Sequence, residues 1–252
     1  EQISEDNPYI ASGALCQGYE LYELMERRSF VDVFYLLFRG ELPTQQESKI
    51  LEMLMIALIN PGPRHPATRA AMNVGIGKTN PQHILPVASA VLGGDYMGGG
   101  EIEAAMRFFR KQQNTDALDF YSNISASLLE LKKKVCCDQE ISQIIPGFGA
   151  RNGGIEIMAA QIAERLNAID GAGKALNWGC QLHSNLNSIG MGWLMTGVAA
   201  AVFADLGFQP RAGGALFQLL GAPGLVAHGL ELANKPITAM PFVSDENYVI
   251  ER

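Results

Sequence analysis

The sequence has little charge and little cysteine. Of its 252 residues only 18% are charged and 8% aromatic, and four are cysteines, two of them the adjacent pair Cys136 and Cys137. No Cys-x-x-Cys spacing occurs, so no structural zinc site is indicated, and we expect free thiols in a reducing cytoplasm. The formal charge of −7 lacks the positive excess that nucleic-acid binding needs, so we expect no nucleic-acid partner.

Long hydrophobic runs and period-two alternation are also missing. The least polar long stretch, residues 188–204, is rich in Gly and Ala and stops at Asp205, so we expect a buried core helix and no membrane association. No segment alternates apolar and polar residues over a useful length, which predicts no β-sheet. Apolar residues make up 48% of the chain, enough to bury the core of one large or two modest domains.

Helical periodicity recurs along the whole chain. Ser29 lies three residues before Asp32, and Thr44 lies three before Glu47, which predicts capped helix N-termini at both places. We therefore predict an all-α fold with about ten or more helices. Towards the C-terminus the expected helices are residues 188–205, 212–219 and 223–234.

Two glycine-rich segments stand out. LGGDYMGGGEIE, residues 92–103, has three consecutive glycines, and PGFGARNGG, residues 146–154, follows later. Glycine permits positive φ and close backbone approach, although the first segment also fits a plain interhelical turn. Neither a phosphate-binding loop at residues 75–79 nor a dinucleotide-binding loop at residues 147–153 is predicted, since the glycine spacing is wrong and no strand precedes either segment.

Five fragments in this order resemble the citrate synthase superfamily, including its short citryl-CoA lyase-like members. They are residues 29–44, 92–101, 146–151, 205–208 and 224–231, spread over nearly the whole chain. The resemblance implies a mostly helical homodimer. It places the large domain at residues 1–100 and 196–252 and the small domain at residues 101–195.

The resemblance also implies a chemistry. In this superfamily an acyl-CoA thioester is converted to an enol and joined to, or cleaved from, an oxoacid, which needs a base and a hydrogen-bond donor for the thioester oxygen. A CoA thioester is thus the implied substrate, with no permanently bound cofactor and no metal. Pro146, Gly147, Phe148 and Gly149 match the CoA-binding loop of the family, and Arg151 matches an arginine that holds the oxoacid carboxylate.

The usual catalytic residues are replaced in this chain. The two family histidines fall on Met97 and Ala150, and the catalytic aspartate falls on Thr196. A shifted alignment does not restore the aspartate, because residues 171–204 contain no Asp or Glu. We assign Met97, Thr196, Arg151 and Asn185 to substrate binding.

Two remaining histidines are the candidate catalytic residues. His183 stands among Ser184, Asn185 and Asn187, which we expect to precede an apolar helix that ends in the cleft. A helix cap at Ser184 or Asn187 explains the same polar cluster. His65 lies near the position of a substrate-contacting histidine of the family.

Three functions remain open. The first is an acyl-CoA carbon–carbon lyase or synthase with altered catalytic residues. The second is a catalytically degenerate protein that binds CoA thioesters or serves as a partner subunit. The third is a conventional citrate synthase or citryl-CoA lyase, which the missing base disfavours. We favour the first, because the glycine segments and the polar cluster around His183 are retained.

The replaced residues predict that the chain does not condense acetyl-CoA with oxaloacetate at a useful rate. Loss of a general base costs about 10² to 10⁴ in rate, and loss of an oxyanion donor costs about 10² to 10³ more. The measurement is thiol release from acetyl-CoA in the presence of oxaloacetate. Turnover at an ordinary enzymatic rate contradicts the prediction.

Overall fold

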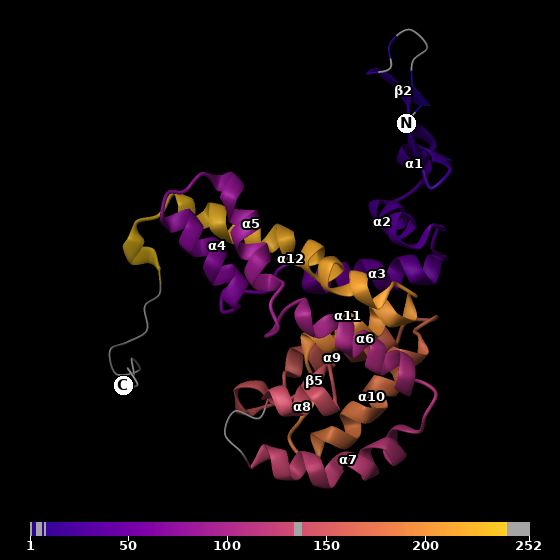
Figure 1. The fold of residues 1–252 in the computed structure, drawn as a ribbon, viewed down its shortest axis with the longest axis vertical. Helices are drawn as coiled ribbons and strands as arrows, with labels where there is room; N and C mark the ends of the chain where they lie inside the picture. The colour runs from indigo at the N-terminus through magenta and orange to yellow at the C-terminus, as the bar shows by residue number, and fades with distance from the viewer. Residues whose placement is uncertain (1, 4–6, 8, 134–137, 241–252) are drawn as a thin grey trace. The chain divides into compact units, whose positions relative to one another are not determined.

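The computed structural model describes the whole chain except residues 1, 4–6, 8, 134–137 and 241–252, so that Cys136, Cys137 and Pro241 lie outside the described residues. The described chain is mostly helical, which confirms the all-α prediction (Figure 1). Its α-helices are α1 Leu21–Arg27, α2 Phe30–Arg39, α3 Gln45–Leu58, α4 Pro66–Ile76, α5 Ile84–Leu92, α6 Gly100–Gln112, α7 Ala117–Lys132, α8 Asp138–Ile144, α9 Ile157–Asn167, α10 Lys174–Asn187, α11 Met195–Asp205 and α12 Pro210–Ala233. Short 3₁₀ turns are η1 Pro81–His83, η2 Arg151–Gly153 and η3 Ile237–Ala239.

Three short antiparallel ladders also occur among the described residues. Their strands are β1 Gln2–Ile3 with β2 Ala11–Gly13, β3 Leu15–Cys16 with β4 Tyr19–Glu20, and β5 Phe148–Gly149 with β6 Gly192–Trp193. The sequence predicted no sheet, because strands of two or three residues are too short to show an alternating pattern.

The predicted caps at the starts of α2 and α3 are present. The Ser29 hydroxyl accepts the Asp32 N–H at 3.1 Å, and the Asp32 carboxylate accepts the Ser29 N–H at 3.1 Å. Thr44 and Glu47 repeat this reciprocal arrangement, at 3.2 Å and 2.8 Å. Each pair satisfies backbone donors that a helix start leaves without intrahelical partners, so the helices begin where the sequence predicts.

The chain divides into two compact units. Unit 1 comprises residues 1–57 and 101–213, and unit 2 comprises residues 58–100 and 214–252. The predicted small domain, residues 101–195, lies wholly within unit 1. Its limits stay a prediction.

Unit 1 is built around α10 and an aromatic core. α10 packs against α7, α9 and α11. Phe109 contacts the rings of Phe148, Trp178 and Trp193, and Phe148 stacks on Trp193 with ring centroids 4.4 Å apart. In the β5–β6 ladder Phe148 lies opposite Trp193. The second glycine-rich segment is therefore anchored in the core of unit 1 by its phenylalanine.

Two glycines bring the same segment against the start of α11. A Cβ atom added to Gly197 would overlap the carbonyl oxygen of Gly147, so the two backbones touch. The Leu194 N–H donates to that carbonyl at 3.0 Å. Only residues without a Cβ allow this approach, which fixes residues 146–151 beside the first turn of α11.

The helix expected over residues 188–205 is shorter in the structure. α11 begins at Met195, because Gly190 adopts a left-handed φ of 67° and Gly192–Trp193 pairs with β5. Once formed, α11 is the buried core helix that the composition predicted, with eight of its residues, Thr196 through Phe203, buried.

Unit 2 contains α4, α5 and most of α12. Gly75 and Gly229 allow the backbones of α4 and α12 to touch, and Met72, Ile76 and Leu232 form a hydrophobic cluster. Residues 212–219 and 223–234 were expected as two helices, but α12 is continuous through Pro223. The Gly224 N–H donates to Ile59 O at 2.9 Å, so a partner outside the helix satisfies it beside the proline.

α12 has 24 residues and is long and apolar enough, by length and composition alone, to cross a membrane. In the structure 44% of its most apolar window is buried, and Gly229 lies against the side chain of Ile84. At Gly229, α12 therefore packs against α5.

The contact between Gly147 and Gly197 predicts that Gly197→Ala destabilises the chain. The added methyl must displace a backbone carbonyl, and overpacking of this kind costs about 1–3 kcal/mol or more. Gly154→Ala is the matched control, because nothing lies within 4 Å of its added Cβ and its φ of −156° suits any residue. The control is expected to leave stability unchanged or raise it by up to about 1 kcal/mol. Urea unfolding measures both, and equal stability of the two variants contradicts the prediction.

Candidate functional site

Glu101, Arg151 and Thr196 form a buried polar cluster in unit 1. Arg151 Nη2 donates to Glu101 Oε1, and the Thr196 hydroxyl donates to Glu101 Oε2 at 2.7 Å. The side chains of Arg151 and Glu101 are only 6% and 12% exposed. The two carboxylate oxygens of Glu101 thus bond different partners, and both bonds are strengthened by charge.

Local structure explains how these three residues meet. Glu101 is in the first turn of α6, where the helix dipole favours a negative charge. Thr196 is in the first turn of α11, and Arg151 follows β5. Because Gly147 and Gly197 hold the β5 segment against α11, the Arg151 side chain reaches the same place.

Glu156 adds a second carboxylate at the start of α11. Its Oε2 accepts the Met195 N–H at 3.2 Å. Burial raises the pKa of the Glu156 carboxyl, against the opposing effects of Arg151 and the Met195 N–H, and the charge of Glu101 raises it further. A half-buried carboxyl with a raised pKa is suited to take up and release a proton.

Glu101 and Glu156 were not predicted as site residues from the sequence. The expected aspartate falls within residues 171–204, whereas Glu101 is 95 positions away from Thr196 along the chain. One signal was present: Glu101 directly follows three glycines and opens a helix. That pattern indicates a helix start but does not indicate which side chain the carboxylate meets.

The predicted site residues belong to both units. Arg151 and Thr196 come together in unit 1, as just described. Met97 belongs to unit 2, where it adopts a left-handed φ of 58° and its carbonyl oxygen bonds His65 Nε2 at 2.9 Å. His65 Nδ1 accepts the Ala67 N–H at 3.1 Å and so caps α4. Because Nδ1 is an acceptor, Nε2 carries the proton, and both ring nitrogens hold the local structure of unit 2.

His183 lies inside α10 and not ahead of an apolar helix, which corrects the sequence prediction. Ser184 and Asn185 donate to Cys180 O and Gln181 O, one turn back in the same helix, each at 3.1 Å. The predicted cap at Ser184 or Asn187 is wrong, since α11 begins after Leu194 without a side-chain cap. The polar residues around His183 are therefore helix-surface residues.

His183 nevertheless has a defined environment. Its Nδ1 accepts the Trp193 N–H at 3.3 Å, so the neutral ring carries its proton on Nε2. Burial lowers the pKa of His183, and the charge of Glu164 partly opposes this. Both side chains line an open groove of about 640 Å³, together with Gly154, Ile155 and Ile157.

The loop predicted to bind CoA is largely part of the core. Gly147, Phe148 and Gly149 are buried, and Pro146 is half-buried. Phe148 is fully buried, and its ring contacts the rings of Phe109 and Trp193. The role of these four residues in CoA binding stays a prediction.

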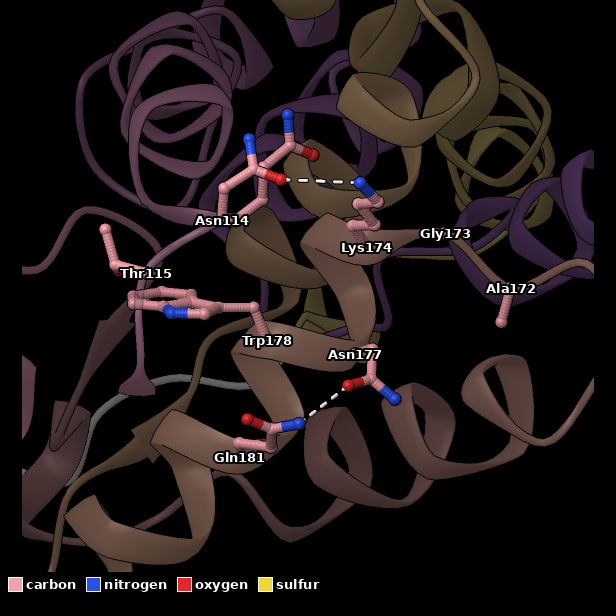
Figure 2. A pocket seen from close by; sticks show the side chains of 9 residues that line it. Asn114, Thr115, Ala172, Gly173, Lys174, Asn177, Trp178 and Gln181 are labelled. Carbon is pink, nitrogen blue, oxygen red and sulfur yellow. Dashed lines mark hydrogen bonds between the residues drawn. The ribbon is translucent and has the colours of Figure 1, made fainter. Parts of the chain in front are cut away.

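Another pocket of unit 1, of about 420 Å³, lies beside the start of α10 (Figure 2). Figure 2 shows Lys174 directed at Asn114, with Nζ 3.4 Å from Oδ1, and Gln181 donating to Asn177 at 2.8 Å. Four amide side chains line it, together with the side chains of Thr115, Lys174, Trp178 and Ala172. The lining contains no carboxylate and no imidazole. It offers polar contacts but no group for proton transfer, and none of the predicted site residues, all of which the structure describes, lines it.

Comparison with known proteins gives a match in structure and not in sequence. No protein-family model and no curated protein sequence matches the chain. A structure of citryl-CoA lyase from Hydrogenobacter thermophilus superposes with a TM-score of 0.74 and 23% identity, over 96% of this chain and 91% of the lyase. The chain has the citrate synthase-like fold.

Two larger proteins contain this fold as part of their chains. ATP citrate lyase from Methanosaeta concilii, in complex with (3S)-citryl-CoA, matches 97% of this chain and 42% of the lyase, with a TM-score of 0.68 and 18% identity. Citrate synthase from Thermotoga maritima matches 89% of this chain and 59% of the synthase, with a TM-score of 0.64 and 18% identity. The predicted resemblance is confirmed at the level of the citrate synthase-like fold.

The buried pair predicts a large effect of Arg151→Met on stability. It leaves the Glu101 carboxylate without its positive partner, which costs about 3–5 kcal/mol. Thr196→Val removes one hydrogen bond to a charged acceptor at constant shape and is expected to cost about 1.5–3 kcal/mol. The double variant Glu101→Met/Arg151→Met removes both charges and is expected to recover most of the loss. Urea unfolding of the three variants measures these differences, and a double variant less stable than Arg151→Met contradicts the explanation by charge.

Proposed function

We propose that this protein acts on an acyl-CoA thioester and makes or breaks a carbon–carbon bond next to the thioester carbonyl. The observation that carries the proposal is the pair of carboxylates, Glu101 and Glu156, at the first turn of α11, where the resemblance expects the catalytic carboxylate and the sequence has Thr196. The similarity of fold to a citryl-CoA lyase supports the same class of reaction.

Glu156 is the proposed base. Its raised pKa suits removal of the weakly acidic proton from the carbon next to the thioester, and it does not share the direct ion pair that engages Glu101. The proton passes to the Glu156 carboxylate, and the carbon forms an enolate with the thioester oxygen. The enolate carbon then bonds to the carbonyl carbon of an acceptor, whose C=O π electrons move to its oxygen, and that oxygen takes the proton from Glu156 to become a hydroxyl. Cleavage is the reverse sequence.

His183 is the proposed donor to the thioester oxygen. The Trp193 N–H fixes Nδ1 as an acceptor, so Nε2–H is the donor of the neutral ring. Burial lowers the pKa of His183 and keeps the ring neutral near pH 7. Two observations place Glu156 near His183. The Trp193 N–H bonds His183 and the Met195 N–H, two residues further on, bonds Glu156. Ile155 and Ile157, the chain neighbours of Glu156, line the same groove as His183. We place the thioester in that groove. The roles that the sequence analysis gives to Asn185, Met97 and His65 stay predictions.

The assembly that we propose is a cytoplasmic homodimer. Besides the resemblance, α5 of unit 2 exposes Leu85, Val87 and Val91, which are 39%, 44% and 40% exposed, and such apolar groups favour burial against a second chain. The alternative function is a catalytically degenerate CoA-binding protein or partner subunit, which has the same fold and binds the thioester without transforming it.

The proposed roles predict exchange of deuterium from D₂O into the carbon next to the carbonyl of acetyl-, propionyl- or butyryl-CoA. Glu156→Gln is expected to slow the exchange by about 10² to 10⁴, and His183→Ala by about 10² to 10³. The rate should rise with pH through the pKa of Glu156, which lies above the ordinary carboxyl range, because only the ionised form accepts the proton. Mass spectrometry of the recovered thioester measures the exchange.

Glu130→Gln is the matched control for Glu156→Gln. Glu130 pairs with Lys133 on the exposed face of α7, so its loss is expected to leave the exchange unchanged. Thioester binding without any exchange, measured by calorimetry, favours the degenerate protein. If Glu156→Gln exchanges deuterium as fast as the wild type, Glu156 is not the base. If the wild-type protein does not bind any of the thioesters, the proposal is overturned.

A further inference from the structure

We propose that Glu101 occupies Arg151 as an internal carboxylate and thereby selects an acceptor substrate that has no carboxylate group at this point. The inference rests on the proposed function only for the identification of the site. It concerns the substrate class: an acyl-CoA thioester together with an uncharged aldehyde or ketone, in place of an oxoacid.

The buried position of Arg151 makes it the group that recognises a carboxylate. A guanidinium presents a planar fork of N–H donors that matches carboxylate geometry, and a desolvated one binds anions strongly. The Arg151 side chain is 6% exposed, and its Nη2 already donates to Glu101. An incoming carboxylate must therefore compete with a partner that the chain itself supplies at no cost in translational entropy.

Glu101 is held in place from two sides. Its Oε1 bonds Arg151 and its Oε2 accepts the Thr196 hydroxyl at 2.7 Å. The rotation that would release Arg151 also breaks the bond to Thr196 and leaves a carboxylate that is 12% exposed without its cation. Such a buried unpaired charge is strongly unfavourable, so a ligand carboxylate does not displace Glu101.

The second carboxylate strengthens the exclusion. Glu156 senses both the Arg151 and the Glu101 charges, so the three side chains act on one another. With Glu156 ionised, as the proposed base must be, one positive and two negative side chains leave an excess negative charge. This negative charge repels the carboxylate of an oxoacid, whereas it does not repel a neutral acceptor.

Glu101→Ala tests the inference by chemical rescue. The substitution removes a two-carbon carboxylate fragment that has the size of acetate. We expect acetate to bind the variant at least about tenfold more tightly than the wild-type protein, which corresponds to one charge-assisted hydrogen bond. The rise in unfolding temperature with acetate concentration, with equal chloride as the ionic-strength control, measures the binding. No CoA thioester is needed, so the result is independent of the proposed reaction.

A second variant covers a folding failure of Glu101→Ala. Glu101→Gln keeps the shape and removes the charge, and is expected to bind glyoxylate at least about tenfold more tightly than the wild type. The double variant Glu101→Gln/Arg151→Gln must lose that gain. The inference is overturned if neither single variant gains affinity for its carboxylate, if the double variant keeps the gain, or if wild type binds glyoxylate as tightly as Glu101→Gln.

Discussion

The arrangement of the candidate site depends on the contact of two backbones, at Gly147 and Gly197. Neither residue has a Cβ, and the loop after α8 can therefore rest directly on α11. The consequence extends beyond packing, because Arg151 follows that loop and Thr196 precedes Gly197 in α11. A separation of one methyl group more would move the guanidinium away from the hydroxyl and from the Glu101 carboxylate between them.

Desolvation acts in opposite directions on the two groups to which we assign the chemistry. Burial raises the pKa of Glu156, an acid that is charged when deprotonated, and lowers the pKa of His183, a base that is charged when protonated. The two pKa values therefore approach each other. Each shift favours the uncharged form of its group, so a thioester in the groove meets a neutral imidazole and a carboxyl that loses its proton at higher pH than an exposed one does.

Local features of the fold could be predicted, and distant pairings could not. The caps at Ser29 and Thr44 follow from residues three positions apart, a relation that any sequence displays. The bond between Thr196 and Glu101 joins residues 95 positions apart, and no local pattern specifies it. The sequence predicts that His183 lies just ahead of an apolar helix, because polar side chains on the surface of α10 resemble a helix boundary. Pro223 resembled a helix start, although a carbonyl of another segment satisfies the neighbouring N–H and lets α12 continue.

The order in which the chain is synthesised has a consequence for unit 2, which joins residues 58–100 to residues 214–252. α4 and α5 leave the ribosome long before the part of α12 that covers Gly75 and Ile84. At ordinary rates of translation the interval is on the order of ten seconds. During this time the apolar faces of α4 and α5 lack their native cover and are open to nonspecific association. A chain truncated before α12 would leave these faces uncovered permanently and would be prone to aggregate.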